Sequence, residues 1–177
     1  MNKILVVILV VYSSASAFGQ DGHLSSRGGE SSFGLGLGMP YGAIGARFMT
    51  NVADNFGLFG GVGYHLAGPG YNFGMLYSFP SNGEIEFYLT GMYGTNGATV
   101  VEGLTDYDEV FMGGTFGVGV KLNSRRKEGN FWDFGLLVPI HGTDFDDQIS
   151  AIKNDSRVGG VTEPIPVAIV VGYNFNL

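Results

Sequence analysis

The stretch Glu163-Pro-Ile-Pro-Val-Ala-Ile-Val-Val-Gly-Tyr-Asn-Phe-Asn-Leu177 decides the fold. Every second residue from position 165 onward is apolar, and the residues between them are mostly small or polar. Because successive side chains of a β-strand point to opposite faces, a period of two predicts one long strand with a wholly apolar face. That face carries Ile165, Val167, Ile169, Val171, Tyr173, Phe175 and Leu177.

The same alternation runs through the rest of the chain and is interrupted by turn-forming residues. Short breaks fall at 40–42, 50–55, 67–70, 80–83 and 123–130, and longer connections at 95–108 and 142–162. The pattern between these breaks predicts strands over 31–39, 43–49, 56–66, 71–79, 84–94, 109–122, 131–141 and 163–177. Eight strands of this length favour an all-β fold, an eight-stranded antiparallel up-and-down barrel.

The N-terminal residues read as a secretory signal peptide over 1–17. Lys3 supplies the positive charge, Ile4–Tyr12 forms an apolar core, and Ala15-Ser16-Ala17 is a small-x-small cleavage site. Residues 18–30 are polar and rich in glycine and serine, which indicates a flexible lead-in. The chain is therefore expected to be exported, to be cleaved near Ala17, and to carry its barrel over 31–177.

Composition excludes several classes of function. The net charge of −7 argues against a nucleic-acid partner. The absence of cysteine excludes disulfides, thiol catalysis, cysteine-ligated metals and a lipid-anchored N-terminal cysteine. Charged residues make up only 14% of the chain, against about 25% in ordinary soluble domains.

The distribution of charge between the two strand faces predicts a transmembrane barrel. Charged strand residues fall on the glycine-rich face, whereas the opposite face is apolar, with aromatic residues towards the strand ends and aliphatic residues between them. A soluble barrel needs the reverse arrangement, because a charge that faces lipid cannot be paired. We expect an ion-pair cluster in the lumen, formed by Arg47, Glu84, Glu86, Lys121 and Asp133. A soluble periplasmic β-protein is the alternative.

The ending Gly172-Tyr173-Asn-Phe175-Asn-Leu177 resembles the C-terminal insertion signal of bacterial outer-membrane barrels. Over residues 31–177 the chain is similar to the small eight-stranded OmpX-like proteins and the OmpA transmembrane domain. The tract 131–140, followed by an acidic loop, resembles uncharacterised outer-membrane barrels of the Bacteroidetes. The resemblance implies the outer membrane of a Gram-negative bacterium, contact with its lipid, and insertion machinery that engages the last strand. Loops 95–108 and 142–162 would then be external and available to an extracellular partner.

The sequence favours a non-enzymatic protein whose acidic loops serve adhesion, envelope stability or partner binding, without a cofactor. Two alternatives stay open: a narrow pore, and a lipid-modifying enzyme at the outer rim, for which His65, Glu109 and His141 are the candidate residues. No nucleophile motif of the Gly-x-Ser-x-Gly type is present. Acidic runs at 106–109 and 144–147 could attract a divalent cation, but they lack a calcium-hand pattern and are interpreted as solvated loops. A short helix over 147–153, with Ile149 and Ile152 capping the barrel mouth, is a further expectation.

Overall fold

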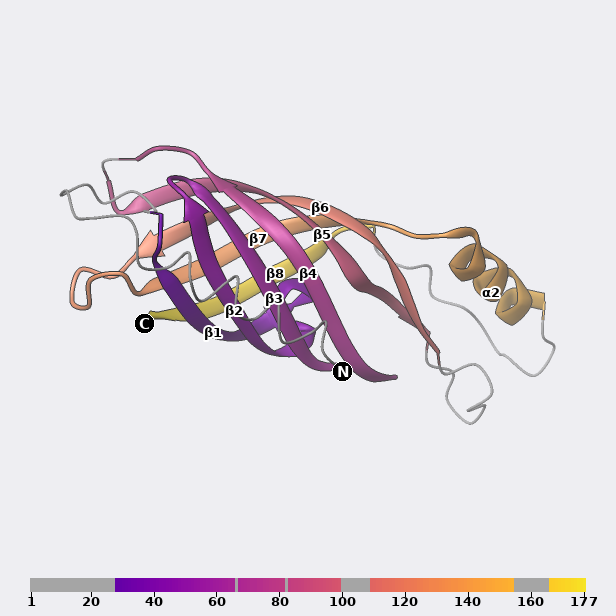
Figure 1. The fold of residues 1–177 in the computed structure, drawn as a ribbon. Coiled ribbons are helices and arrows are strands. Elements are labelled where there is room, and N and C mark those ends of the chain that lie inside the picture. The colour runs from indigo at the N-terminus through magenta and orange to yellow at the C-terminus, as the bar shows by residue number, and fades with distance from the viewer. Residues whose placement is uncertain (1–27, 66, 82, 100–108, 155–165) are drawn as a thin grey trace, which may run out of the picture.

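The computed structural model describes residues 28–65, 67–81, 83–99, 109–154 and 166–177. These residues form eight strands that close into an antiparallel barrel, in which each strand pairs with its neighbours in sequence and β1 pairs with β8 (Figure 1). The all-β, eight-stranded antiparallel prediction is confirmed. The strands are β1 (Ser31–Gly38), β2 (Ala43–Ala53), β3 (Phe56–His65), β4 (Gly68–Ser78), β5 (Ile85–Thr99), β6 (Glu109–Asn123), β7 (Phe131–Ile140) and β8 (Ala168–Asn176).

The barrel has two different ends. At one end, called the turn end, lie Ser31, Asn176 and the connecting residues 54–55, 79–81, 83–84 and 124–130. At the other end, called the helix end, lies the α-helix α2 (Thr143–Asn154), beyond the strands in Figure 1. The helix is longer than the predicted 147–153. Phe145 packs edge-on against Phe111 of β6, with ring centroids 5.1 Å apart, and joins α2 to the barrel. Of the two residues expected to cap the barrel mouth, Ile152 is buried and Ile149 is half-buried.

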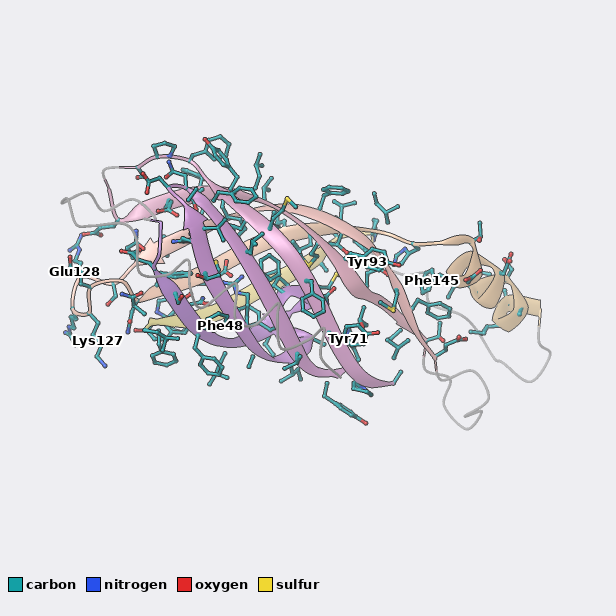
Figure 2. All side chains as sticks on the ribbon, viewed as in Figure 1. Phe48, Tyr71, Tyr93, Lys127, Glu128 and Phe145 are labelled. Atoms are coloured by element: carbon teal, nitrogen blue, oxygen red, sulfur yellow. The ribbon has the colours of Figure 1, made fainter. Side chains whose placement is uncertain are left out.

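The two faces of the strands differ as the alternation predicts. Aliphatic and aromatic side chains project outward from the strands (Figure 2). Ile44, Val62, Phe73 and Ile169 are each at least 63% exposed. Inward-facing positions hold glycine, polar residues and a small core, so the apolar surface lies outside the barrel and the polar groups inside.

Three predicted breaks are wrong in part or in whole. Residues 50–55 were expected to form a turn, but β2 continues to Ala53, and only 54–55 connect it to β3. Residues 67–70 were expected to form a turn, but β4 begins at Gly68 and Pro69 pairs with Tyr64. Among the described residues, the pairing of β4 with β5 begins only at Asn72, so Pro69, which has no N–H, lies on a stretch paired on one side. Residues 95–99 were expected to lie in a loop, but they extend β5 through a bulge at Asn96. Polar residues suit a strand here because their side chains face the lumen.

The connection between β1 and β2 folds into the barrel. It contains a short 3-10 helix, η1 (Met39–Tyr41), and Tyr41 is completely buried. The sequence indicated only a short turn at this point. Gly42 and Ala43 both adopt positive φ angles, 69° and 83°, where the chain leaves η1 and enters β2. Alanine is strained at a positive φ angle, so the contacts that η1 makes inside the barrel must offset this cost.

Among the residues that the structure describes, no helix is long and apolar enough to cross a membrane.

Candidate functional site

Four charged side chains meet in the lumen and form two ion pairs. Arg47 of β2 and Asp133 of β7 lie 2.7 Å apart, and Lys121 of β6 and Glu86 of β5 lie 2.8 Å apart. All four residues are at most 2% exposed. Two positive and two negative groups give this cluster no net charge, which suits an interior that water does not enter freely.

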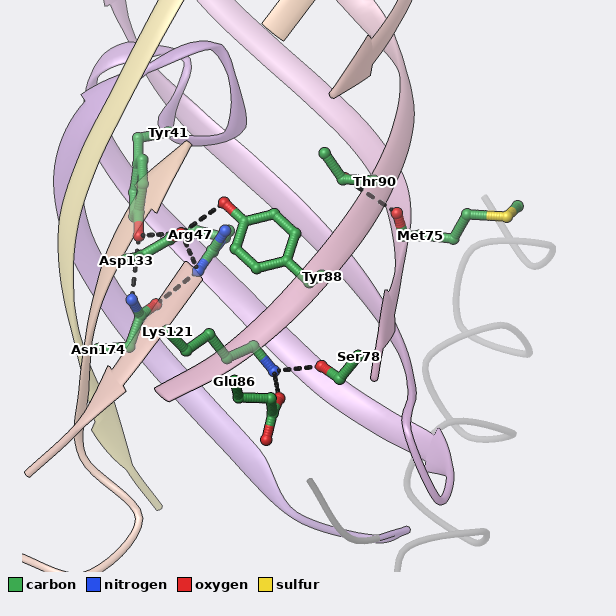
Figure 3. A network of polar contacts seen from close by, with 10 residues as sticks. All are labelled: Tyr41, Arg47, Met75, Ser78, Glu86, Tyr88, Thr90, Lys121, Asp133 and Asn174. Carbon is green, nitrogen blue, oxygen red and sulfur yellow. Dashed lines mark hydrogen bonds and ion pairs between the residues drawn. The ribbon is translucent and has the colours of Figure 1, made fainter. Parts of the chain in front are cut away.

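Asp133 is the centre of the first pair and accepts hydrogen bonds from several donors (Figure 3). Tyr88 Oη donates to Asp133 Oδ1 at 2.6 Å, and Tyr41 Oη donates to Asp133 Oδ2 at 3.2 Å. Asn174 of β8 bridges the group, because its Nδ2 donates to Tyr41 Oη and its Oδ1 accepts from Arg47 Nη2, both at 3.0 Å. The carboxylate is thus held by two hydroxyls and a guanidinium, as a desolvated charge requires.

The guanidinium of Arg47 also contacts aromatic rings. It lies 4.7 Å from the ring centroid of Tyr41 and 5.6 Å from that of Phe59. These cation–π contacts add attraction that a desolvated cation can use. We call Tyr41, Arg47, Tyr88, Asp133 and Asn174 the lumen layer.

The second pair lies nearer the turn end. Lys121 Nζ donates to Glu86 Oε1 and to Ser78 Oγ, both at 2.8 Å (Figure 3). It also lies 5.3 Å from the ring centroid of Phe131. In the strand register, Lys121 stands opposite both Glu86 and Asp133. The two ion pairs are therefore adjacent, and β6 lies between the strands that supply the two acids.

Glu84 does not belong to the cluster, contrary to the sequence prediction. It precedes β5, is about half exposed, and forms an ion pair with Arg125 of the 124–130 turn. The pattern placed it on the inward face by extending the alternation one residue too far, since β5 begins at Ile85. The hydrogen bond to Glu84 and its negative charge raise the pKa of the exposed Arg125 guanidinium.

Three members of the lumen layer, Tyr88, Asn174 and Tyr41, were not in the cluster predicted from the sequence. Of these, Tyr41 is the one that comes from a turn. Glycines border the space that Tyr41 and the rest of η1 occupy, which we call the seat of η1. A Cβ on Gly172 would lie 2.1 Å from Tyr41 Oη, and one on Gly36 would lie 2.8 Å from its ring. A Cβ on Gly61 would lie 1.9 Å from the carbonyl oxygen of Pro40. Glycine on the inward face of β1, β3 and β8 thus makes room for η1. The clustering of glycine on that face was the available signal.

The three candidate residues for a lipid-modifying enzyme at the outer rim lie on separate segments of the chain. His141 stacks on Phe145 with ring centroids 4.1 Å apart, His65 ends β3, and Glu109 begins β6. No hydrogen bond or ion pair among the described residues links His65, Glu109 and His141. His65 Nε2 is buried without a hydrogen-bond partner within the described part of the chain.

The acidic loops are described only in part. Asp106 and Asp108 lie outside the described residues, as does the side chain of Asp146, whereas Asp144 and Asp147 are exposed on α2. Within the described ranges, no group of three or more His, Asp or Glu side chains could hold a metal ion.

The residues of the predicted C-terminal insertion signal lie in β8 and at its end. Phe175 and Leu177 are 40% and 74% exposed on the outer face, and Tyr173 packs edge-on against Trp132 with centroids 5.1 Å apart. Tyr173 Oη accepts a hydrogen bond from Asn130 Nδ2 at 3.1 Å. Gly172 faces inward beneath Tyr41.

Comparison with known proteins gives no assignment, because no family model, curated protein or solved structure matches the chain. The class of protein defined by the structure is a closed, eight-stranded antiparallel β-barrel with an apolar exterior and an interior that holds two buried ion pairs.

Proposed function

We propose that this chain is a non-enzymatic, integral β-barrel protein of the bacterial outer membrane. The observation that carries the proposal is the inversion of the two faces. Charged strand residues Arg47, Glu86, Lys121 and Asp133 are buried inside, while large apolar side chains on all eight strands are exposed outside. Soluble monomers rarely expose contiguous apolar patches larger than a few hundred Å². A lipid environment would cover this surface.

The exposed aromatic residues support a position across a bilayer. Phe48 lies towards the turn end, whereas Tyr71 and Tyr93 lie towards the helix end (Figure 2). Aliphatic residues such as Val62, Val118 and Leu136 are exposed on the same face. Aromatic side chains at two levels with aliphatic residues between them are typical of the two interfaces of a membrane barrel.

The lumen layer argues against a pore for solutes. Tyr41, Arg47, Tyr88, Asp133 and Asn174 come from different parts of the barrel wall and from η1, and each is at most 2% exposed. Eight-stranded barrels generally leave an interior that side chains can fill. The interior ion pairs therefore serve stability in this proposal, and the function lies with the segments at the helix end.

We place the helix end at the cell surface, where segments 95–108 and 142–162 would present acidic groups for adhesion, envelope stability or partner binding. The short connections of the turn end would face the periplasm, as in other outer-membrane barrels. Insertion machinery would engage β8 through Gly172, Tyr173, Phe175 and Leu177.

The test is expression with the native leader in a Gram-negative host. The protein should fractionate with the outer membrane, resist carbonate extraction and migrate faster in gels when unheated than when boiled. An unrelated outer-membrane barrel of similar size serves as the loading control. Recovery as a folded monomer in the soluble periplasmic fraction would refute the proposal.

A further inference from the structure

A cavity at the turn end of the barrel is not part of the proposed function. Its volume is about 430 Å³, within the range of about 300–1,000 Å³ that small-molecule sites occupy. It is lined by the starts of β1 and β7, by parts of β2, β5 and β6, and by exposed residues of the 124–130 turn. The Lys121–Glu86 pair lies in its wall.

The charges around the cavity are compensated. Its lining and the adjoining turn carry as many carboxylates as basic groups: Glu30, Glu84, Glu86 and Glu128 against Lys121, Arg125, Arg126 and Lys127. Lys121 and Arg125 are in ion pairs with two of these carboxylates, and Glu30 also has an interaction partner. The cavity therefore offers an ion no excess of opposite charge, which favours a neutral ligand.

Ser32 contributes an unpaired hydroxyl to the wall of the cavity. The residue is only 4% exposed, and its Oγ has no hydrogen-bond partner within the described part of the chain. In the strand register Ser32 stands opposite Met49 and Asn176, which line the same cavity. A buried hydroxyl without a partner costs free energy, which a hydrogen-bonding ligand in the cavity recovers.

Three asparagine side chains in the lining are also available to a ligand. Asn51 lies near the end of β2, and Asn123 and Asn176 are the last residues of β6 and β8. The structure shows no hydrogen bond between their side-chain amides and another described residue. Each amide presents a donor and an acceptor side by side. A ligand hydroxyl is likewise both donor and acceptor, so these amides suit a ligand that carries several hydroxyls.

The cavity also has apolar surface. Met49 and Phe131 are both buried, at 3% and 6% exposure, and both line it beside the polar groups. A sugar ring combines these two kinds of surface, because its hydroxyls lie around the edge and its C–H groups on the faces. A wholly apolar ligand would leave Ser32 and the asparagines unpaired.

We propose that this cavity binds a neutral saccharide of mono- or disaccharide size. Its hydroxyls would form hydrogen bonds with Ser32 Oγ and with the amides of Asn51, Asn123 and Asn176, and one face of a ring would pack against Phe131. Binding requires only the closed barrel, so it would persist even if the protein were located elsewhere than in the outer membrane.

The experiment is calorimetric titration of the full barrel, solubilised in a detergent without a sugar headgroup. The probes are glucose, galactose, N-acetylglucosamine, maltose and lactose. At least one should bind saturably at one site per chain, with a Kd of about 1 mM or tighter. The affinity should not change as salt is raised, because the ligand is neutral.

Three further compounds test the chemistry of the ligand. Cyclohexanol, which has a ring of similar size but a single hydroxyl, should not bind measurably. Glucosamine and glucuronate, the cationic and anionic counterparts of glucose, should bind no more tightly than the neutral sugar that binds best.

Two variants and a control test the position of the site. Ser32→Ala and Asn123→Ala should each weaken sugar binding about two- to tenfold, the range for loss of one hydrogen bond. Ser32→Ala should do so without lowering the midpoint of urea denaturation, because its hydroxyl has no partner among the described residues. Thr143→Ala removes an exposed hydroxyl at the helix end and should leave the affinity unchanged. Heat-modifiable migration in gels verifies that each variant is folded.

Several results would overturn the proposal: no saturable binding of any of the five neutral sugars, equal binding of cyclohexanol, tighter binding of glucosamine or glucuronate than of every neutral sugar, or an affinity that Ser32→Ala and Asn123→Ala change no more than Thr143→Ala does.

Discussion

The hydroxyl of Tyr41 lies 3.2 Å from the carboxylate of Asp133, although 92 positions separate the two residues in the sequence. This contact ties an inward-folded turn to the far wall of the barrel. Asn174 binds the same hydroxyl from a third element, β8. The turn between β1 and β2 thereby becomes part of the core, and the stability of the barrel should depend on it.

Tyr41→Phe removes the hydroxyl but keeps the ring. Asp133 would lose a donor and Asn174 Nδ2 would lose its acceptor, while both stay buried. We expect a loss of about 1–3 kcal/mol in the free energy of unfolding, the usual cost of leaving buried polar groups unsatisfied. Urea titration of the barrel refolded in detergent measures it. Tyr64→Phe, on the exposed outer face, is the control and should be neutral. An equal cost for both variants would contradict the role given to Tyr41.

The glycine seat of η1 makes a second prediction. In Gly61→Ala the new methyl group would lie 1.9 Å from the carbonyl oxygen of Pro40, so η1 must shift. Overpacking of this kind costs about 1–3 kcal/mol. Gly114→Ala is the matched control, because nothing lies within 4 Å of its Cβ position, and it should be neutral or stabilising by about 0.4–1 kcal/mol. Comparable losses at the two positions would show that strand propensity, not the seat of η1, governs the effect.

Breaking the buried ion pair should cost more stability than breaking the exposed one. Arg47→Met leaves Asp133 as an uncompensated buried carboxylate, which should cost about 3–5 kcal/mol. Arg47→Met combined with Asp133→Asn should recover much of that loss, because no charge is then stranded. Arg125→Met breaks the exposed pair with Glu84 and should leave the denaturation midpoint unchanged. If the double variant is no more stable than Arg47→Met, charge compensation is not what the pair provides.

The sequence predicted the barrel and its two faces because period-two alternation depends on local geometry alone. It also predicted that Arg47, Glu86, Lys121 and Asp133 share the interior, since inward positions of a closed barrel must converge. It could not predict the partner of each charge, because register and strand stagger decide which residues stand opposite one another. Tyr41 was missed for a related reason: periodicity does not tell whether a turn folds outward or inward.

The chain has no cysteine, so single cysteines can report topology without background. Ala151 is exposed on α2 and Glu128 is exposed in the 124–130 turn, at opposite ends of the barrel. With the helix end outside, a membrane-impermeant maleimide should label Ala151→Cys on intact cells and Glu128→Cys only after the cells are broken. The reverse pattern would invert the proposed orientation, and labelling of both on intact cells would indicate that the protein is not confined to a sealed membrane.

The outer face of β8 gives the sharpest test of a lipid environment. Ile169 is 67% exposed and pairs with Leu136 of β7, which is 53% exposed on the same face. In a bilayer, Ile169→Arg would place a guanidinium among acyl chains, at a cost of about 2–4 kcal/mol near the midplane. Ile169→Leu keeps the apolar character and should cost almost nothing. Both variants would be refolded into lipid vesicles and titrated with denaturant.

If the face were solvated instead, arginine would be tolerated as well as leucine. If it were the core of a soluble assembly, arginine would be costly, but the unmodified protein would fold in buffer without lipid or detergent. A large loss for arginine alone, in a protein that requires lipid to fold, is therefore the result that a membrane barrel predicts and the other two arrangements do not.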